Sequence, residues 1–375
     1  MTRSEGIITF LSVSDIHLGN IRTPTNFILD NLEQELFCAK IAALDLLIIA
    51  GDLFDRQLEY NHPSSGRILL FVDQILNECS THNVKLRILE GTPSHDNKQN
   101  KIFDDLYATD NYTCDMKYVD TLSVEHIEQW GIKVLYVPDK IRPTCQLVYD
   151  DTIKMFESLG ITEVDLAIIH GTFSHQLPIV IKESYDPLQW LKLVKHWILL
   201  GHVHIHSIFN RIVASGSFDR LAQGEEGPKG YLMGSINLKD TSKDEIYFIE
   251  NTRAKKYITI DCTYLTLEDS LSKLRFIIEN TPNESYIRIK AKPDNPIVAN
   301  ITEVKKFNLS NIYSILTEDE SEQELNEVID DELDNWVAIN INKDNICDII
   351  LKRLSIKNTS GDILSLVEKF IKMYR

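Results

Sequence analysis

The sequence predicts an α/β sandwich, and three features of the chain carry this prediction. Between residues 7 and 204, short apolar runs alternate with segments of helical periodicity, a pattern typical of parallel βαβ units. The runs are rich in Ile, Val and Leu, as in LDLLIIA and HWILL, which indicates strands buried on both faces. Five of the runs lead directly into residue types that bind metals.

The connecting segments have the length and periodicity of helices. TPTNFILDNLEQELFCAKIAAL follows the first run, with Thr or Asn available as a cap, and SSGRILLFVDQILNECSTHN follows the second. DDTIKMFESLG predicts a short helix that ends at Gly160. Further strands are expected at residues 116–125 and in IKVLYVPD.

The pattern changes after the last of the five runs. From Ile205 to Asn251, strands and turns predict a mostly antiparallel part packed onto the first. KKYITIDC, LTLEDSLSKLRFII and SYIRIKAK then predict a strand, a helix and a strand of a small α+β module. We therefore expect one domain over residues 1–252 and a second over residues 253–317.

Composition favours an ordinary globular chain of the reducing cytoplasm. The 375 residues are 43% hydrophobic and 25% charged. No apolar run approaches the length of a membrane-spanning helix, and the N-terminal segment lacks the pattern of a signal peptide. Six cysteines without paired spacing argue against a disulfide framework and a thiolate zinc site.

Charge is the second compositional constraint. The net charge of −17 excludes a simple DNA-coating protein. Ten acidic residues and no Lys or Arg lie between Glu318 and Asp334, which predicts an acidic linker over residues 318–340. Residues 341–375 read as two amphipathic helices. Nucleic acid remains possible as a substrate, because bound cations change the local sign of a site.

Metal-binding residue types stand at the ends of the five apolar runs. Ligands bind outside the carboxyl ends of such strands, at one edge of a sheet. We therefore expect five distant segments to meet in one polar pocket. Mixed imidazole and carboxylate ligands suit borderline divalent metals, and their number suits two ions. The residues concerned are Asp15, His17, Asp52, His95, His170, His202 and His204.

The order of these motifs resembles that of the calcineurin-like metallophosphoesterases. The matching segments are SDIHLG at 14–19, GDLFD at 51–55, GTPSHD at 91–96, His170 and GHVH at 201–204. Gly216-Ser217 and EGPKGY at 226–231 are similar to the SbcD-type DNA double-strand-break repair nucleases of phages and bacteria. The resemblance covers residues 7–235. It implies a four-layer α/β/β/α metallophosphoesterase sandwich with a small α+β cap domain that contacts DNA.

The resemblance also implies a role for each residue of the pocket. Asp52 would bridge two divalent cations, with Mn²⁺ expected and Mg²⁺ as the alternative. His95, supported by Asp96, would donate a proton to the departing oxygen. The remaining ligands would be Asp15, His17 and His204 for the first cation, and His170 and His202 for the second. Arg56, Arg220 and Lys229 stand beside the motifs and are candidates for contacts with phosphate.

One motif departs from the family pattern. The usual Gly-Asn-His-Asp, whose Asn binds the second cation, is here Gly91-Thr92-Pro93-Ser94-His95-Asp96. Two residues are inserted, and Ser94 stands at the position of the Asn. A hydroxyl is a shorter and weaker ligand than an amide oxygen. Ser94, Asn97 or a backbone carbonyl is expected to complete the second site, and loss of activity is the alternative.

Three functions follow from these features. The first is a metal-dependent DNA nuclease, both exonuclease and endonuclease, acting in repair, recombination or end processing. The resemblance implies a homodimer, an SbcC-like coiled-coil ATPase as partner, and a location in the cytoplasm, or the host cytoplasm for a phage protein. The second is a phosphatase or phosphodiesterase for small nucleotides, and the third is a weakly active scaffold subunit. Residues 341–375 could dock the ATPase or close the cap domain.

Overall fold

The structure is a computed structural model that describes residues 6–37, 40–59, 61–109, 112–176, 183–281, 285–300, 304 and 312–316. The chain divides into two compact units, Met1–Gln323 and Glu324–Arg375. All described residues belong to the first unit. The predicted acidic linker and the predicted C-terminal helices lie outside the described residues. No described helix combines the length and the apolar character needed to cross a membrane.

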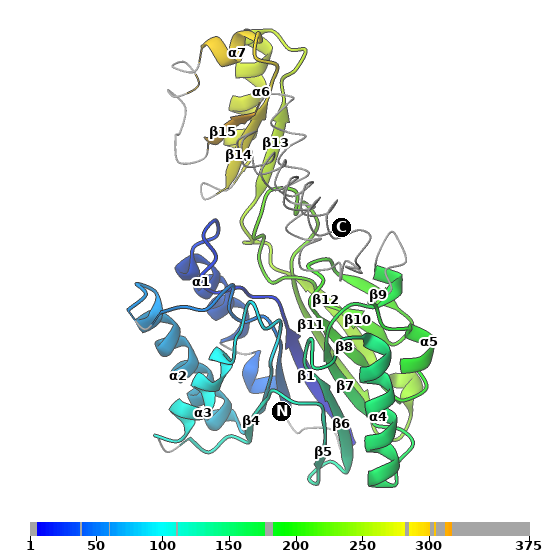
Figure 1. Cartoon of the computed structure of the whole chain (residues 1–375). Coiled ribbons are helices and arrows are strands. Elements are labelled where there is room, and N and C mark those ends of the chain that lie inside the picture. The colour runs from blue at the N-terminus through cyan, green and yellow to red at the C-terminus, as the bar shows by residue number, and fades with distance from the viewer. Residues whose placement is uncertain are drawn as a thin grey trace, which may run out of the picture. The chain divides into compact units, whose positions relative to one another are not determined.

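Two six-stranded sheets form the main part of this unit (Figure 1). The first has the order β12-β11-β1-β2-β3-β4 and the second β5-β6-β7-β8-β10-β9. The strands of the first sheet are β1 (Ile7–Val13), β2 (Leu46–Ala50), β3 (Lys85–Leu89), β4 (Met116–Val119), β11 (Gly230–Asn237) and β12 (Glu245–Glu250). Those of the second are β5 (Ser123–Ile127), β6 (Ile132–Val137), β7 (Leu166–His170), β8 (Ile198–Gly201), β9 (Ser207–Phe209) and β10 (Ile212–Ala214).

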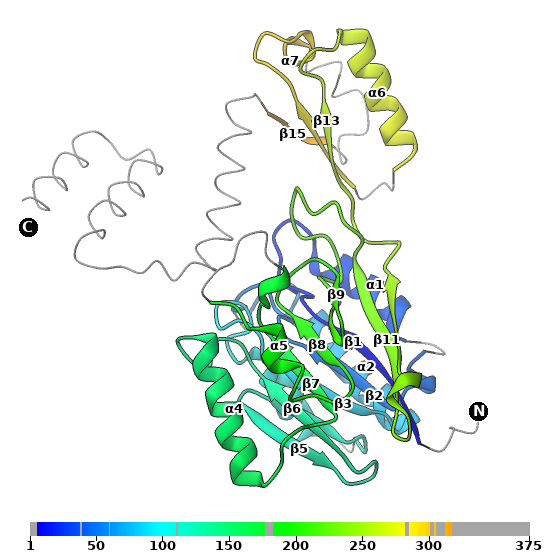
Figure 2. The same cartoon turned by 90° about the vertical axis from the view of Figure 1, so that its right-hand side faces the viewer.

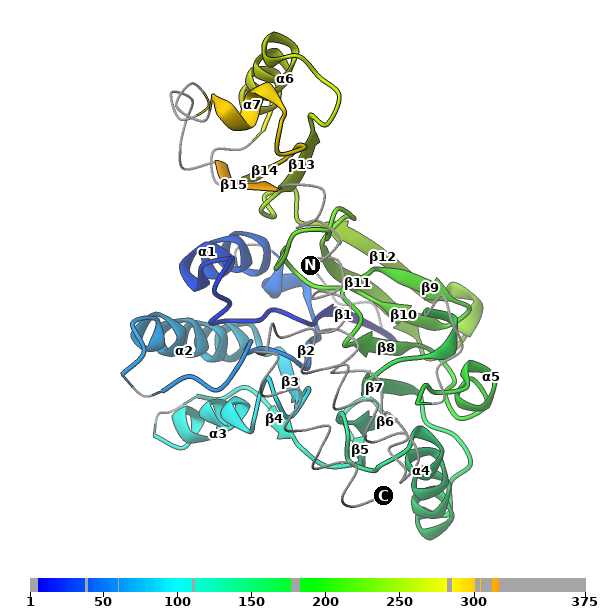
Figure 3. The same ribbon diagram turned by 45° about the horizontal axis from the view of Figure 1, so that its top comes forward.

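The helices cover the outer faces of the two sheets. On the first sheet lie α1 (Thr25–Leu36), α2 (Ser65–His82) and α3 (Ile102–Tyr107), which gather on one side in Figure 3. Against the second lie α4 (Cys145–Leu159) and α5 (Pro187–Trp190), as Figure 2 shows. Short 3₁₀ turns complete this part: η1 (Ile41–Ala43), η2 (Gln99–Lys101), η3 (Ser174–Gln176) and η4 (Thr241–Lys243).

Alternation along the strands explains why their apolar runs are continuous. In β2, Leu46 and Ile48 point into a core shared by the two sheets, which also contains Ile168 and Leu199 of the second sheet. Leu47 points the other way, into the core beneath α1 and α2. Because both faces are buried, every position of the strand is apolar. This arrangement confirms the predicted mixed α/β class.

Residues 205–251, predicted to form an antiparallel part packed onto the first, instead contribute strands to both sheets. β11 and β12 join the first sheet, where β11 pairs antiparallel with β1 through Phe10 and Gly234. β9 and β10 join the second sheet, where β9 pairs antiparallel with β10 and β10 pairs parallel with β8. Local strand patterns do not specify which edge a strand joins, so this pairing depended on the tertiary structure.

The predicted helices form with shifted ends. α4 begins at Cys145, where the Thr144 hydroxyl accepts a hydrogen bond from the Leu147 N–H (3.3 Å). It ends at Gly160 in the left-handed conformation (φ 65°), as the sequence predicts. The first predicted helix stops earlier than expected, because α1 ends at Leu36 and a separate 3₁₀ turn follows.

A small parallel module follows the two sheets. Its sheet has the order β13-β14-β15, with β13 (Tyr257–Asp261), β14 (Tyr286–Lys290) and β15 (Ile312–Leu316). α6 (Leu267–Glu279) and α7 (Pro296–Ala299) connect them. Ile260, Leu274 and Ile289 belong to a hydrophobic core of its own. The predicted strand, helix and strand thus form one β-α-β unit.

Candidate metal centre

The five predicted ligand segments meet in one place, but two sheets supply them. β1, β2 and β3 belong to the first sheet, whereas β7 and β8 belong to the second. The main-chain N–H of His202 donates to both carboxylate oxygens of Asp15 (2.8 and 3.0 Å). His170 Nδ1 donates to the carbonyl oxygen of Ala50 (2.8 Å). These bonds join the sheets at the site, so the expected single sheet edge is replaced by two facing edges.

Four of the site residues have left-handed backbone conformations. The φ angles are 52° at Asp15, 56° at His17, 50° at Asp52 and 99° at His202. This conformation costs a non-glycine residue about 1–2 kcal/mol, and such strain is concentrated at functional sites. His202 has therefore left the extended path of β8. The local turns direct the side chains inward, and no sequence pattern revealed them.

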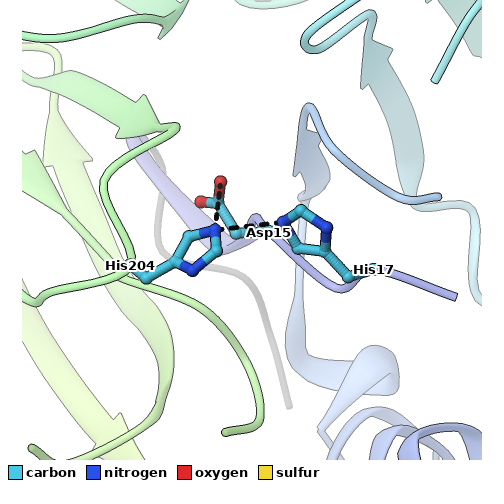
Figure 4. Close-up of side chains that lie close together, drawn as sticks. All are labelled: Asp15, His17 and His204. Atoms are coloured by element: carbon cyan, nitrogen blue, oxygen red, sulfur yellow. Dashed lines mark hydrogen bonds and ion pairs between the residues drawn. The ribbon is translucent and has the colours of Figure 1, made fainter. Parts of the chain in front are cut away.

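One cluster of ligand atoms lies beside the end of β1 (Figure 4). It contains Asp15, His17 and His204, all presented toward one another. The Nε2 atoms of His17 and His204 are 3.1 Å apart, and His204 Nε2 is 4.0 Å from Asp15 Oδ1. Two imidazole nitrogens and one carboxylate oxygen at these separations can hold a divalent cation.

A second cluster lies beside the ends of β2 and β7. It contains Asp52, His170 and His202. Asp52 Oδ2 is 3.1 Å from His170 Nε2 and 4.0 Å from His17 Nε2 in the first cluster. One carboxylate oxygen therefore faces both clusters, which is the position required of a bridging ligand.

Charge interactions in the second cluster are strong. Burial opposes ionisation of Asp52, but the neighbouring His170 outweighs it and holds the pKa of Asp52 well below its usual range. Burial likewise opposes charge on His170, yet Asp52 raises the pKa of His170 to about 10. Burial and the charge of His170 lower the pKa of His202 well below its usual range. The cluster thus holds an anionic oxygen and a neutral imidazole.

His95 lies at the margin of the first cluster. Its Nδ1 is 3.2 Å from His17 Nδ1, and the ring is half-buried. Asp55 Oδ1 is 3.3 Å from His17 Nδ1, so His17, Asp55 and His95 form a third group of ligand type. Burial lowers the pKa of His95. Asp55 was not among the predicted site residues, although it is the second aspartate of the GDLFD motif.

Asp96 has a different role from the one predicted. Its carboxylate accepts main-chain N–H bonds from Asp52 (3.0 Å), Phe54 (2.9 Å) and Gly91 (2.8 Å). Asn100 Nδ2 also donates to it (2.6 Å). Burial, with the charge of Asp52, raises the pKa of Asp96 to about 7. Asp96 therefore ties two ligand loops together through their backbones.

The structure corrects the assignment of Ser94. Ser94 is exposed, whereas Thr92, two residues earlier, is buried with 1% of its surface accessible. The Thr92 hydroxyl lies in the second cluster, 3.1 Å from Asp52 Oδ2. Counting back from His95 placed Ser94 at the ligand position, but the inserted residues bulge outward and leave the residue after Gly91 in the pocket.

Two of the three side chains predicted to contact phosphate are buried and have partners within the protein. Arg220 is buried, and its guanidinium donates to the carbonyl oxygens of Ala254 (3.3 Å) and Gly227 (2.9 Å), among others. Lys229, with 2% exposure, donates to Ser217 Oγ (2.8 Å). Arg56 is exposed and donates to the Gly19 carbonyl (3.0 Å). Arg220 and Lys229 are thus structural, and only Arg56 keeps access to a ligand.

Glu225 is a site residue that the sequence did not indicate. Its Oε1 is 3.1 Å from His204 Nδ1, and its Oε2 pairs with Lys229 Nζ at 2.7 Å. Burial opposes this charge, but His204 and Lys229 outweigh it and keep the pKa of Glu225 well below its usual range. A carboxylate only accepts, so His204 Nδ1 carries the hydrogen and Nε2 faces the first cluster. Carboxylates of this kind orient metal-binding histidines.

Replacing Glu225 by glutamine is expected to weaken Mn²⁺ binding at the first cluster by about 10- to 100-fold. The amide no longer requires the hydrogen on His204 Nδ1, so the Nε2 lone pair is not held toward Asp15. Titration of the chain with Mn²⁺, followed by electron paramagnetic resonance of the free ion, measures the change. Glu226→Gln is the matched control, because Glu226 is exposed. Equal affinities for wild type and Glu225→Gln would contradict this role.

Comparison with known proteins gives no family assignment. No family model and no curated protein matches the chain. GAP50, the anchor in the inner membrane complex of Plasmodium, is 11% identical with a TM-score of 0.38, over 67% of this chain and 87% of that chain. Another crystal structure is 12% identical with a TM-score of 0.40, over 66% of this chain and 100% of that chain. Both TM-scores are too low to assign a family or an activity.

Proposed function

We propose that the protein is a metal-dependent DNA nuclease with the metallophosphoesterase fold. The observation that carries the proposal is the shared position of Asp52, whose Oδ2 faces two separate clusters of imidazole and carboxylate ligands. Enzymes that displace an oxygen in line at phosphorus use two cations bridged in this way. The motif resemblance supports a phosphodiester of DNA as the substrate.

The donor set fits two divalent cations. The first would be held by Asp15, His17 and His204, and the second by His170 and His202, with Asp52 between them. Ligands of this mixed type suit Mn²⁺ better than Mg²⁺, because imidazole is a softer donor than water or carboxylate. When bound, the cations would neutralise phosphate charge and lower the pKa of a water molecule.

The side chains of the chain itself have three tasks in this proposal. Asp52 keeps the two clusters in register, and Glu225 fixes the tautomer of His204. His95 stands at the rim of the first cluster, with its Nδ1 3.2 Å from His17 Nδ1, where an imidazole can exchange a proton with a bound substrate. It is thereby placed to serve the departing ribose oxygen. Asp96 holds the loops on which Asp52 and His95 lie.

The proposed partners rest on the same resemblance. We propose a homodimer that works in the cytoplasm, or in the host cytoplasm for a phage protein, with an SbcC-like coiled-coil ATPase. The small β-α-β module after the two sheets supports a substrate larger than a single nucleotide, because a minimal phosphatase does not need it. A small-nucleotide phosphodiesterase and a weakly active scaffold are the competing functions.

Cleavage of linear double-stranded DNA by the full chain tests the proposal. We expect degradation with Mn²⁺ and none with EDTA, and a loss of about 10²- to 10⁴-fold in rate for His95→Ala. His126→Ala is the control, because His126 is an exposed histidine of β5 far along the chain from the motifs. The nuclease proposal would be contradicted if Mn²⁺ supported no degradation of DNA, either with or without the ATPase. Faster hydrolysis of a small nucleotide diester would favour the phosphodiesterase.

A further inference from the structure

Thr92 stands inside the second cluster rather than beside it. Its hydroxyl oxygen is 3.1 Å from Asp52 Oδ2, 3.2 Å from His202 Nδ1 and 3.5 Å from His170 Nε2. The side chain is buried, with 1% of its surface accessible. The hydroxyl, a carboxylate oxygen and two imidazole nitrogens, from three loops and the end of β7, therefore lie close together.

The separations match those of ligands around a single cation. In an octahedral site with bonds of about 2.1 Å, neighbouring donor atoms are about 3.0 Å apart. The contacts of the Thr92 hydroxyl with Asp52 and His202 are close to this value, as is the 3.1 Å between Asp52 Oδ2 and His170 Nε2.

The backbone of the loop holds this arrangement in place. The Thr92 N–H donates to Asp52 Oδ1 (2.5 Å), which turns Oδ2 toward the hydroxyl and the two histidines. Asp96 accepts from the N–H of the preceding residue, Gly91 (2.8 Å). Pro93 and Ser94 are exposed, so both side chains lie outside the pocket. The hydroxyl is thus presented by a fixed backbone.

The two clusters differ in charge. The first has its own carboxylate, Asp15, besides the shared Asp52, while the second has only Asp52 among its described ligands. Metal affinity depends on the charge and number of the ligands. A neutral hydroxyl adds a donor but no charge, so the second cluster is the weaker cation site.

We propose that the Thr92 hydroxyl is a direct ligand of the second cation and that this cation binds after the first and more weakly. The inference rests on the proposed cation centre and specifies its second half. It assigns the ligand role to Thr92 instead of Ser94, Asn97 or a backbone carbonyl. The hydroxyl donates its hydrogen to a neighbouring acceptor and offers an oxygen lone pair to the cation.

Binding of Mn²⁺ to the full chain, followed by electron paramagnetic resonance of the free ion, tests this assignment. We expect two ions per wild-type chain with unequal affinities. Thr92→Val keeps the branched shape and removes the hydroxyl, and is expected to weaken the second ion by about tenfold or more while leaving the first unchanged. Thr92→Ser keeps the hydroxyl and should retain both ions. Ser94→Ala, in the same loop, is the matched control.

A third variant gives a readout that packing alone cannot produce. Thr92→Cys places a soft thiol at the same point, so Cd²⁺ affinity at the second site should rise above that of wild type. Thermal unfolding of each variant checks its folding, and Thr92→Ser and Thr92→Cys keep the test open if the valine variant unfolds. Unchanged Mn²⁺ binding by Thr92→Val, a single ion in wild type, or no gain of Cd²⁺ in Thr92→Cys would each overturn the assignment.

The outcomes separate this inference from the nuclease proposal. Suppose that the chain has two unequal Mn²⁺ sites, that Thr92 substitutions weaken the second, and that no DNA is cleaved. This result would support the ligand role of Thr92 and contradict the nuclease proposal. If the wild-type chain cleaves DNA with Mn²⁺ and Thr92→Val binds both ions normally, the nuclease proposal would stand and the ligand role of Thr92 would be contradicted.

Discussion

Replacing Asp52 by asparagine is expected to lower Mn²⁺-dependent DNA cleavage by at least about 10³-fold. Asp52 Oδ2 faces both His17 and His170, at 4.0 and 3.1 Å. The amide keeps the size of the side chain and an oxygen for the Thr92 N–H, but it removes the one negative charge common to the two clusters. The Mn²⁺ affinity of both sites should therefore fall together, which we do not expect from replacing any other single ligand.

The measurement has two parts. Initial rates of cleavage give the loss of activity, and Mn²⁺ titration gives the number of bound ions. Asp30→Asn is the matched control, because the Asp30 side chain is 60% exposed and pairs with Arg67 at the surface. The bridging role of Asp52 would be contradicted if Asp52→Asn kept more than about a tenth of the wild-type cleavage rate and still bound two ions.

Gly201→Ala is expected to lower the free energy of unfolding by about 2–3 kcal/mol and to disturb cation binding. A Cβ atom at Gly201 would lie 2.3 Å from the Ala50 carbonyl oxygen and 2.6 Å from His170 Nδ1. These are the two atoms whose hydrogen bond joins the sheets at the site. Relief of the clash requires β7 or β8 to move away from β2, and His170 moves with it.

Gly66→Ala supplies the contrast. Gly66 lies in α2 with nothing within 4 Å of an added Cβ, and alanine favours a helix over glycine by about 0.5–1 kcal/mol. In chemical denaturation, the free energy of unfolding should therefore rise for Gly66→Ala and fall for Gly201→Ala. A Gly201→Ala chain as stable as Gly66→Ala, with wild-type Mn²⁺ affinity, would show that the sheets do not need this close approach.

Residues at strand ends were predictable because two local properties coincide there. A strand buried on both faces must be apolar throughout, so the first polar residue after it marks its end. Asp52 follows LLIIA, and His170 ends LAIIH. The structure brings these residues together with Asp15, His95 and the GHVH histidines. Their residue types already favoured a divalent cation.

Residues that act through contacts between loops were not predictable. Glu225 reaches His204 because of the path of the chain after β10, and Thr92 enters the second cluster because the insertion bulges outward. Lys229 and Arg220 stand beside the motifs in the sequence, yet burial and carbonyl partners occupy both side chains. Proximity along the chain does not specify which buried polar groups become partners.

The sequence by itself determined the α/β class, the main strands and helices, and the ligand types at the strand ends. These depend on hydrophobic periodicity and on residue chemistry, which are local. Only the tertiary structure decided that two sheets supply the site, that Asp52 faces both clusters and that Thr92 rather than Ser94 joins the second. These depend on left-handed turns at Asp15, His17, Asp52 and His202, which the packing of the two sheets stabilises against their local cost.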